Sequence, residues 1–394
     1  MNRSVHYLRR YEEVIRSHWL KEANRRCFNI ISTHVFNRVF DLINSNWKDL
    51  NVWSRLLFIE STDKYNWWWL WDWIFKTAML WDLNRSGHLV DMVVHTSRRD
   101  IFARNPDILN LYEYGWFSDI GSLSRVLKEN TYDAIMLIYP NWEMMLLALA
   151  SRNKSVVYFE KKQYEYAIKT NHVEMYRNIT KNNIPNLEFW TWELKLRVTK
   201  QELKDAESLI SFTPWISYIW INVWARSSLR HFKNWSEIID LLDKKYPQKL
   251  RFVLFGKDNT LWIDKEIESR FWERIINMVW KTKNLRQLYA LLSLMDLNIW
   301  SDWWNINASM ALKIPSVPIF SVVDWEGRID NVFPKENIIK WNCSAWDCFD
   351  KTFWMKCTIT WQESEDHSTT PPCLSSENLI NEISDRCIKI LNLS

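Results

Sequence analysis

The chain has 394 residues, of which 47% are hydrophobic and 25% are charged, and its 51 basic and 47 acidic side chains leave a formal net charge of +4. This is the composition of a globular protein of two or three domains, which excludes a disordered chain, a collagen-like fibre and a small disulfide scaffold. A charge so near zero also argues against nucleic acid as a partner, because nucleic-acid binding rests on neutralising many phosphates.

Residues 1–53 are predicted to form a helical extension. Val5, Leu8, Tyr11 and Ile15 recur at helical spacing with basic residues between them. The first 60 residues carry ten Lys or Arg against six Asp or Glu, so they hold all of the net charge. Helices of this kind either pack on the following domain, which we favour, or lie against an anionic membrane surface.

The sequence favours a cytoplasmic location, with peripheral contact on the inner face of the membrane as the further expectation from the basic extension. The N-terminus lacks the uninterrupted apolar stretch of a signal peptide, and no 18 consecutive residues are apolar. Six cysteines, five of them after position 340, do not resemble a secreted disulfide framework. A reducing compartment follows from this cysteine usage.

Residues 54–198 are predicted to form a first Rossmann-like domain. Short apolar runs alternate with amphipathic helices, and the strands are expected at 56–60, 90–95, 133–139 and 155–160. Strands that alternate with helices are typical of βαβ units in a parallel sheet.

Residues 199–373 repeat the pattern and are predicted to form a second Rossmann-like domain. A helix near 201–210 comes first, and the final helix, in the segment 374–394, is expected to pack back across the domains. Strands are expected at 218–223, 250–255, 275–279, 296–299 and 316–320. The predicted fold class is therefore α/β, with two Rossmann-like domains facing a cleft and a helical extension at the N-terminus.

Tryptophan is far too frequent and glycine far too rare. The chain has 28 Trp and five Gly, whereas glycine ordinarily supplies roughly 7% of residues. Residues 67–73 read WWWLWDW between a predicted strand and a helix, where the backbone takes positive φ and approaches ligands, and both favour glycine. Tryptophan recurs in the loops within 214–228 and 298–312, and at the predicted turns of Trp235 and Trp280.

Two interpretations of the tryptophans remain open. With glycine at these positions the loops become GGGLGDG, GINVGARSS and GSDGGNINAS, which are ordinary glycine loops, so we hypothesise that UGA codons read as glycine were translated as Trp. UGG codons at Trp68, Trp71, Trp224, Trp303 and Trp304 would contradict this hypothesis. The alternative is a set of genuine aromatic rings that stack on sugars or lie at a membrane interface.

Read with glycine, four segments in order resemble glycosyltransferase family nine, the ADP-heptose:lipopolysaccharide heptosyltransferases and their relatives, over roughly residues 54–360. Residues 55–80, RLLFIESTDKYNWWWLWDWIFKTAML, resemble the opening strand, glycine loop and LGD signature of the family. Residues 218–232, YIWINVWARSSLRHF, resemble the start of its donor domain. Residues 285–320, LRQLYALLSLMDLNIWSDWWNINASMALKIPSVPIF, resemble its donor loop and helix. Cys343, Cys348 and Cys357 resemble its C-terminal cysteine segment.

The resemblance implies a GT-B fold, with an N-terminal acceptor domain, a C-terminal nucleotide-sugar domain and the active site in the cleft between them. It also implies an inverting glycosyltransferase of the bacterial cell envelope, as in lipopolysaccharide biosynthesis. The expected donor is a nucleotide-diphosphate sugar such as ADP-heptose, and the expected acceptor is a cell-surface glycan or a lipid-linked molecule. The helical extension is outside the common core of the family.

Asp72 is the candidate general base. It stands in the loop that follows the first strand, at the start of a helix, where a carboxylate can take the proton of an acceptor hydroxyl. The same position suits an N-cap of a helix that begins at Trp73, and the family match favours the base. Trp69 and Trp71 are the candidate acceptor-binding positions in this loop.

The donor candidates lie in the second domain. Backbone N–H groups at the helix near Trp304 would hold the diphosphate, and Arg230 would stabilise the leaving group, with Arg226 as a competing candidate. Asp302 either meets the ribose or caps the next helix, and Asn307 stands where the family usually has His. The remaining candidate donor-binding positions are Trp224, Ser227, Ser228, Trp303 and Asn305.

No cofactor or metal ion is expected. The sequence has no Asp-x-Asp near a strand end, and the spacing of Cys343, Cys348, Cys357 and Cys373 is not that of paired zinc ligands, so we expect free or packed thiols. Two other functions remain open. One is a nucleotide-sugar epimerase of the same fold, and the other is a non-catalytic, Trp-rich carbohydrate-binding or membrane-interface protein.

Overall fold

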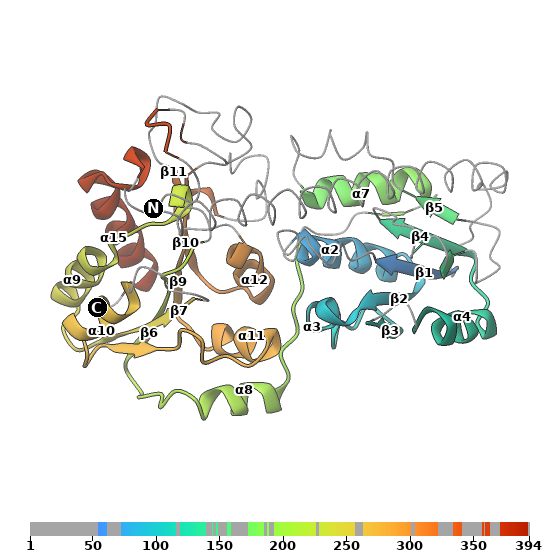
Figure 1. Cartoon of the computed structure of the whole chain (residues 1–394), viewed down its shortest axis with the longest axis horizontal. Helices are drawn as coiled ribbons and strands as arrows, with labels where there is room; N and C mark the ends of the chain where they lie inside the picture. Colours follow the sequence, from blue (N-terminus) through green and yellow to red (C-terminus); the bar gives the residue numbers. More distant parts are fainter. Residues whose placement is uncertain are drawn as a thin grey trace, which may run out of the picture.

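Two parallel sheets, each with helices packed on it, form the body of the protein in this computed structural model (Figure 1). The structure describes residues 54–60, 72–115, 119–138, 144, 147–148, 156–158, 172–184, 187–188, 193–225, 228–256, 263–300, 304–321, 334–340, 357, 359–362 and 371–392. The predicted helical extension, 1–53, lies outside the described residues.

The first sheet has the strand order β3-β2-β1-β4-β5, and its pairings are parallel. Its strands are β1 (Arg55–Glu60), β2 (Leu89–His95), β3 (Asn110–Tyr114), β4 (Ala134–Ile138) and β5 (Val156–Tyr158). The central strand β1 is buried from Leu56 to Glu60, because helices cover both faces of a parallel sheet. The helices of this domain are α2 (Asp72–Arg85), η2 (Thr96–Arg98), α3 (Arg99–Phe102), α4 (Asp119–Glu129) and α7 (His172–Asn183).

The second sheet has the order β11-β10-β9-β6-β7-β8, again with parallel pairings. Its strands are β6 (Ser217–Asn222), β7 (Leu250–Phe255), β8 (Ile275–Asn277), β9 (Leu297–Trp300), β10 (Ser316–Phe320) and β11 (Ile339–Lys340). The accompanying helices are α8 (Lys200–Glu207), η3 (Ser228–Arg230), α9 (Trp235–Lys245), α10 (Ile263–Arg270), α11 (Leu285–Ser293), α12 (Trp304–Leu312), η4 (Lys335–Asn337), η5 (Pro372–Leu374) and α15 (Glu377–Leu391).

Both sheets have the doubly wound order in which the chain starts in the middle and winds outward in two directions. The predicted α/β class with two Rossmann-like domains is confirmed. All nine predicted strands are present, and two observed strands were not predicted. β3 is half-buried over its first three residues, exposed at Glu113 and buried only at Tyr114, and β11 has only two residues, so neither shows the continuous apolar run of a central strand. The predicted helix 201–210 is α8, which ends at Glu207.

The two domains share a hydrophobic cluster. Phe75 and Met79 of α2 belong to the same buried cluster as Ala308 and Ala311 of α12, and Figure 1 shows these two helices next to each other at the boundary between the domains. Each helix follows the central strand or its neighbour in its own sheet, so their packing brings the first turns of both to the domain boundary.

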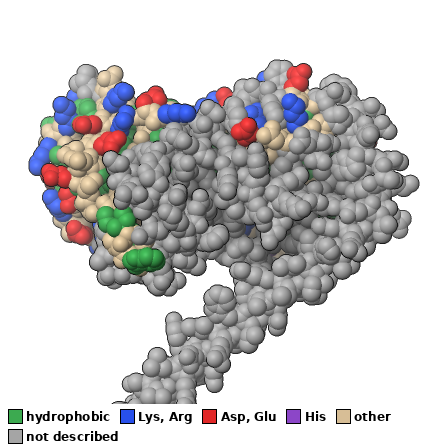
Figure 2. Space-filling view, turned by 90° about the horizontal axis from the view of Figure 1, so that it is seen from above, with side chains coloured by type: hydrophobic (Ala, Val, Ile, Leu, Met, Phe, Trp, Pro, Cys, Tyr) green, Lys and Arg blue, Asp and Glu red, His purple; other side chains and the backbone are tan. Residues whose placement is uncertain are grey.

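Basic and acidic side chains are interspersed on the described surface of the second domain, the left-hand lobe in Figure 2. This arrangement fits the near-zero net charge of the chain. Among the described residues, no helix is both long and apolar enough to cross a bilayer.

The segment between the two sheets ends in a capping box at α8. The hydroxyl of Thr199 accepts from the backbone N–H of Glu202, and the Glu202 carboxylate accepts from the backbone N–H of Thr199. Glu202 also accepts hydrogen bonds of 2.8 and 2.6 Å from the guanidinium of Arg286. Burial by itself would raise the pKa of Glu202, but the hydrogen bonds from Arg286 and Thr199 outweigh it and lower the pKa to about 2.

We expect the Glu202 interactions to make the protein less stable in acid. Because the folded pKa lies below that of the unfolded chain, the stabilisation is complete above about pH 4.5 and is lost as the pH falls toward 2. The measurement is the urea midpoint of the wild type and of Glu202→Gln at pH 7, 4.5 and 2.5. The difference between the two proteins should shrink as the pH falls, and a constant difference would contradict the assignment.

Candidate functional site

Asp72 is the first residue of α2, which follows β1, so its backbone lies at the carboxyl end of the central strand of the first sheet. Ligands of open α/β sheets bind at this edge. The helix begins at Asp72 and not at Trp73 as predicted, which places Asp72 inside the first turn. Trp69 and Trp71, the predicted acceptor-binding positions, lie outside the described residues.

A buried ion pair lies beneath this edge and was not predicted from the sequence. Glu60 ends β1, Lys76 lies one helical turn after Asp72 on α2, and the Lys76 ammonium contacts the Glu60 carboxylate. Both residues are 1% exposed. Burial raises the pKa of Glu60, and the charges of Lys76 and Arg98 oppose that increase. The sequence signal for this ion pair is a charged residue, Glu60, at the end of an apolar run. Its partner, Lys76, is identified only by the three-dimensional structure.

The neighbouring strands add polar groups to the same edge. His95 ends β2, and its Nε2 lies 3.1 Å from the carbonyl oxygen of Gly115. Tyr114 ends β3, and its hydroxyl donates to the carbonyl oxygen of Glu60 at 3.4 Å. Arg98, in the η2 turn after β2, is also buried. The edge of the first domain therefore carries cationic and hydrogen-bonding groups around the start of α2.

In the second domain, the loop after β6 is held by Asn222. This side chain is 1% exposed, and its Oδ1 accepts from the backbone N–H of Trp224 at 3.4 Å. Its Nδ2 has no hydrogen-bond partner among the described residues. Gly256 follows the adjacent strand β7, and a Cβ at that position would lie 2.9 Å from the Cβ of Trp224. Asn222 is thus a candidate polar group for a ligand at this edge, which the sequence analysis did not single out.

The predicted donor residues near η3 are buried. Ser228 begins η3 and Arg230 ends it, with 1% and 6% of their surface exposed. The hydroxyl oxygen of Ser228 accepts a hydrogen bond from the side-chain amide Nε2 of Gln362 at 3.3 Å. His231 Nε2 lies 3.0 Å from the carbonyl oxygen of Val223, which fixes the turn against the end of β6.

The predicted residues around α12 are placed in part. Trp304 and Asn305 form the start of α12, which follows β9, and this agrees with the helix predicted near Trp304. Asn307 is 1% exposed in the same helix. Ser227, Asp302 and Trp303 lie outside the described residues, as does the competing candidate Arg226.

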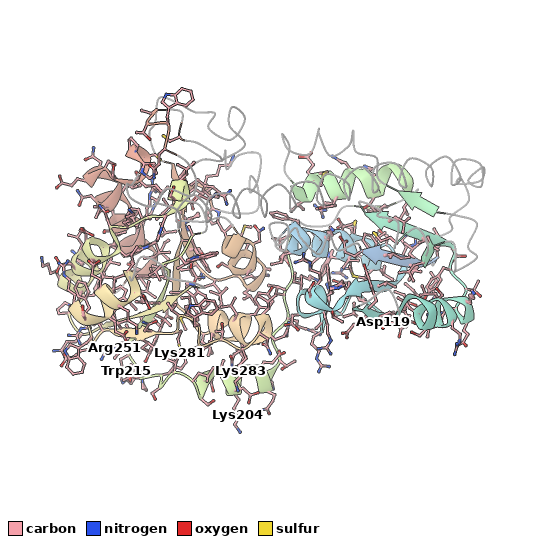
Figure 3. All side chains as sticks on the ribbon, in the orientation of Figure 1. Asp119, Lys204, Trp215, Arg251, Lys281 and Lys283 are labelled. Atoms are coloured by element: carbon pink, nitrogen blue, oxygen red, sulfur yellow. The ribbon has the colours of Figure 1, made fainter. Side chains whose placement is uncertain are left out.

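Three tryptophans occupy backbone conformations that favour glycine. Trp215, Trp280 and Trp361 have φ of 71°, 62° and 57°, in the left-handed region that a bulky residue rarely adopts. Their side chains are 96%, 61% and 69% exposed, so no packing of the ring offsets the strain. Trp215 lies at the outer margin of the second domain, away from the first domain (Figure 3). Trp280 was predicted at a turn, and this is confirmed.

Other tryptophans differ from the predicted loop or turn positions. Trp235 is the first residue of α9 and is completely buried against Phe232, so its predicted turn is wrong. Trp300 ends β9 and is buried. Trp220 is buried inside β6, in agreement with the predicted strand 218–223. Apolar contacts hold these rings in the interior, and a buried ring does not require a positive φ. The indole N–H groups of Trp220 and Trp235 have no acceptor among the described residues, which is unfavourable.

The described residues contain no group of three or more His, Cys, Asp or Glu arranged to hold a metal ion. Cys357 and Cys387 are buried thiols, and Cys373 is partly exposed. Cys343 and Cys348 lie outside the described residues.

The whole fold is similar to solved structures of glycosyltransferases, although no family model and no curated protein matches the sequence. The ADP-heptose lps heptosyltransferase II of E. coli superposes with a TM-score of 0.62 and 14% identity, over 86% of this chain and 98% of that one. A glycosyl transferase family 9 protein from Veillonella parvula gives 0.65 and 14% identity, over 88% and 100%. The E. coli heptosyltransferase WaaC with ADP gives 0.50 and 14% identity, over 72% and 92%.

Because the first two similarities cover 86% and 88% of this chain, they extend over both domains. The chain therefore has a two-domain GT-B fold like that of family 9 glycosyltransferases.

Proposed function

We propose that the protein is an inverting glycosyltransferase that moves a sugar from a nucleotide-diphosphate donor to a cell-surface glycan or a lipid-linked acceptor. Heptose is the proposed sugar and ADP-heptose the proposed donor, because the similar structures include heptosyltransferases, one of them with ADP. The observation that carries the proposal is the packing of α2 on α12, since these helices begin at the carboxyl edges of the two sheets.

In the proposed reaction Asp72 accepts the proton of the acceptor hydroxyl. The hydroxyl oxygen then attacks the anomeric carbon from the side opposite to the nucleotide, and the bond from that carbon to the diphosphate oxygen breaks. The departing diphosphate would be held by backbone N–H groups at the start of α12 and by Arg230. Configuration at the anomeric carbon is inverted because the attack and the departure occur on opposite faces.

The proposed setting is the cytoplasm, with peripheral contact at the inner face of the membrane where a lipid-linked acceptor would be available. The basic residues of the extension support this part of the proposal, because they attract anionic lipids. Neither a metal ion nor a cofactor has a role in the proposed mechanism.

The first experiment identifies the residues at the Trp positions by reading the gene's codons, and then measures ADP binding and sugar transfer with the corresponding protein. ADP binding with transfer to an acceptor supports the proposal. Turnover of a UDP- or ADP-sugar to its epimer without any acceptor would favour the epimerase. UGG codons in the loops together with no nucleotide binding would favour a non-catalytic aromatic surface.

Arg230→Gln is expected to lower kcat by about 10²-fold, because one preorganised donor to a developing negative charge is worth that much. Arg251→Gln is the matched control, since Arg251 is the second residue of β7 and lies at the opposite, amino edge of the sheet. Steady-state kinetics with saturating donor provide the measurement. If Arg226→Gln gives the large loss and Arg230→Gln does not, the leaving-group role belongs to Arg226.

A further inference from the structure

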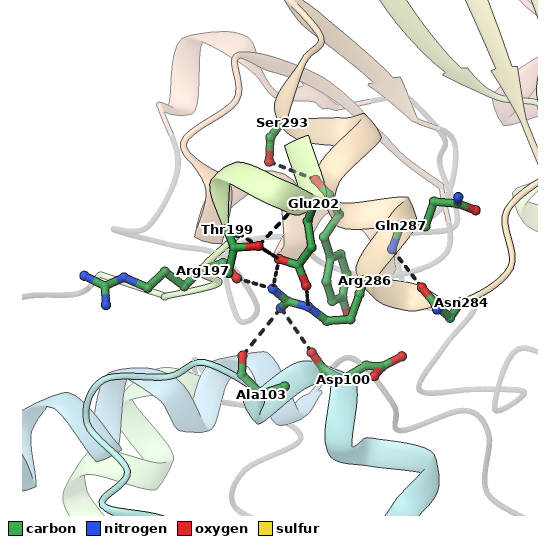
Figure 4. Close-up of polar contacts among 10 residues, drawn as sticks. Asp100, Ala103, Arg197, Thr199, Glu202, Asn284, Arg286, Gln287 and Ser293 are labelled. Carbon is green, nitrogen blue, oxygen red and sulfur yellow. Dashed lines mark hydrogen bonds and ion pairs between the residues drawn. The ribbon is translucent and has the colours of Figure 1, made fainter. Parts of the chain in front are cut away.

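Arg286 connects three segments of the chain at the boundary between the domains (Figure 4). It lies in the first turns of α11 and is 8% exposed. Its guanidinium donates to both carboxylate oxygens of Glu202, and to the carbonyl oxygen of Arg197 at 2.5 Å. The remaining nitrogen donates to the carbonyl oxygens of Asp100 and Ala103 in the first domain, at 3.4 and 3.5 Å.

These contacts fall into two groups of different strength. The hydrogen bonds to the Glu202 carboxylate are short and charge-assisted, and the one to the Arg197 carbonyl oxygen is short as well. Together they fix α8, and the linker that precedes it at Arg197, firmly to α11. The contacts to Asp100 and Ala103 are at the long end of hydrogen-bond geometry. The second domain and the linker therefore hold the guanidinium tightly, and the first domain contacts it only through the two long hydrogen bonds.

The first-domain partners lie at the C-terminal end of α3. Carbonyl groups in the last turn of a helix lack partners within the helix, and a cation satisfies them. α3 follows directly after η2, which ends at Arg98, beside the Glu60 carboxylate. A shift of α3 relative to Arg286 would therefore also move Arg98, which is one of the polar groups at the sheet edge where α2 begins.

The other contacts between the domains are poor at fixing an angle. The shared cluster of α2 and α12 is apolar and so is non-directional. The ion pair of Lys313 with Glu193 is exposed at the surface, where such pairs contribute little. The backbone hydrogen bond from the Leu196 N–H to the Ala311 carbonyl oxygen has a direction but is long, at 3.4 Å. Arg286 adds further direction, because a planar guanidinium holds its partners in fixed positions.

We propose that Arg286 is a positioning residue that sets the angle between the two domains. It keeps the linker, α8 and α11 as one unit, and the end of α3 moves over the guanidinium when the domains close around their substrates. The link to catalysis rests on the proposed function, since a two-domain transferase needs the acceptor on one domain aligned with the donor on the other.

The test compares Arg286→Gln, Arg286→Lys and Glu202→Gln with the wild type and with Lys283→Gln. Lys283 is an exposed cation just before α11 and serves as the matched control. Dyes introduced through unnatural amino acids at Arg125 on α4 and Glu266 on α10, which are both exposed, report the interdomain distance. ADP binding, KM and kcat are measured on the same proteins.

Arg286→Gln is expected to broaden the distance distribution and to lower kcat by about 10²-fold, because small misplacements of reacting groups have effects of that size. The dissociation constant of ADP should stay within about twofold, since each domain keeps its own binding site. Arg286→Lys should recover part of the loss, because the charge remains but the planar fork does not. Glu202→Gln, in which Gln still caps α8, should also broaden the distance distribution and lower kcat. Lys283→Gln should change neither quantity.

Unchanged distances and kcat in a folded Arg286→Gln protein would overturn the proposal. A tenfold weaker ADP affinity in the same variant would also overturn it, because Arg286 would then support the donor site itself. If Arg286→Gln does not fold, Glu202→Gln decides between these outcomes. A wild type that neither binds ADP nor transfers sugar would reject the proposed function, while a broadened distance distribution in the variants would still support the positioning role.

Discussion

Replacing Trp215, Trp280 and Trp361 together by glycine is expected to raise the free energy of unfolding by about 2 kcal/mol, from a mean gain of about 0.8 kcal/mol at each of the three sites. A left-handed backbone costs a non-glycine residue about 1–2 kcal/mol, and the greater freedom of glycine in the unfolded chain offsets up to about 1 kcal/mol per site. All three rings are mostly exposed, so little burial is lost. Urea denaturation of the triple variant and the wild type provides the measurement.

Trp272→Gly is the matched control for this prediction. Trp272 is 72% exposed, like the other three, but it is not among the residues with positive φ. Glycine at position 272 should therefore leave the stability unchanged or lower it, because only the unfolded-state cost applies. A triple variant no more stable than the wild type would argue that these sites do not favour glycine, and UGG codons at them would reject the recoding hypothesis.

Asp72→Asn is expected to lower kcat by about 10²–10⁴-fold, the contribution of a general base. Asp72 is the first residue of α2, where asparagine removes only the favourable interaction of the carboxylate with the helix dipole, typically about 0.3–1 kcal/mol, so the helix should persist and the unfolding free energy should change little. The dissociation constant of ADP should not change, because the proposed donor site lies in the other domain. Transfer rates, ADP titration and thermal unfolding of the same preparation provide the measurements.

Asp119→Asn is the control for the Asp72 variant. Asp119 is likewise the first residue of a helix in the first domain, and it lies on α4, away from the domain boundary (Figure 3). Asparagine keeps an amide oxygen that can still accept from the Gly115 N–H, and Asp119 has no part in the proposed reaction. Full transfer activity in Asp72→Asn would assign Asp72 to the helix terminus alone and would leave the base unidentified.

The sequence predicted the α/β fold because central parallel strands are buried on both faces and read as apolar runs. The runs at 56–60 and 250–255 became β1 and β7 almost to the residue. β3 escaped prediction because an edge strand exposes part of one face and so loses that pattern. Trp235 was misjudged because an asparagine before it suggested a turn, whereas burial against Phe232 places it at the start of a helix.

What the sequence determined by itself was local: the strands, the helices that follow them, the position of Asp72 after β1, and a glycine-like pattern that recurs at Trp280. The tertiary structure decided which distant residues meet. Glu60 with Lys76, Trp224 beside Gly256, and Arg286 with Glu202 and the end of α3 are separated by 16 to 186 positions. The periodicity of a sequence indicates only which face of an element is buried. The packing of whole elements decides which residues pair across the fold, so no local pattern predicts these partners.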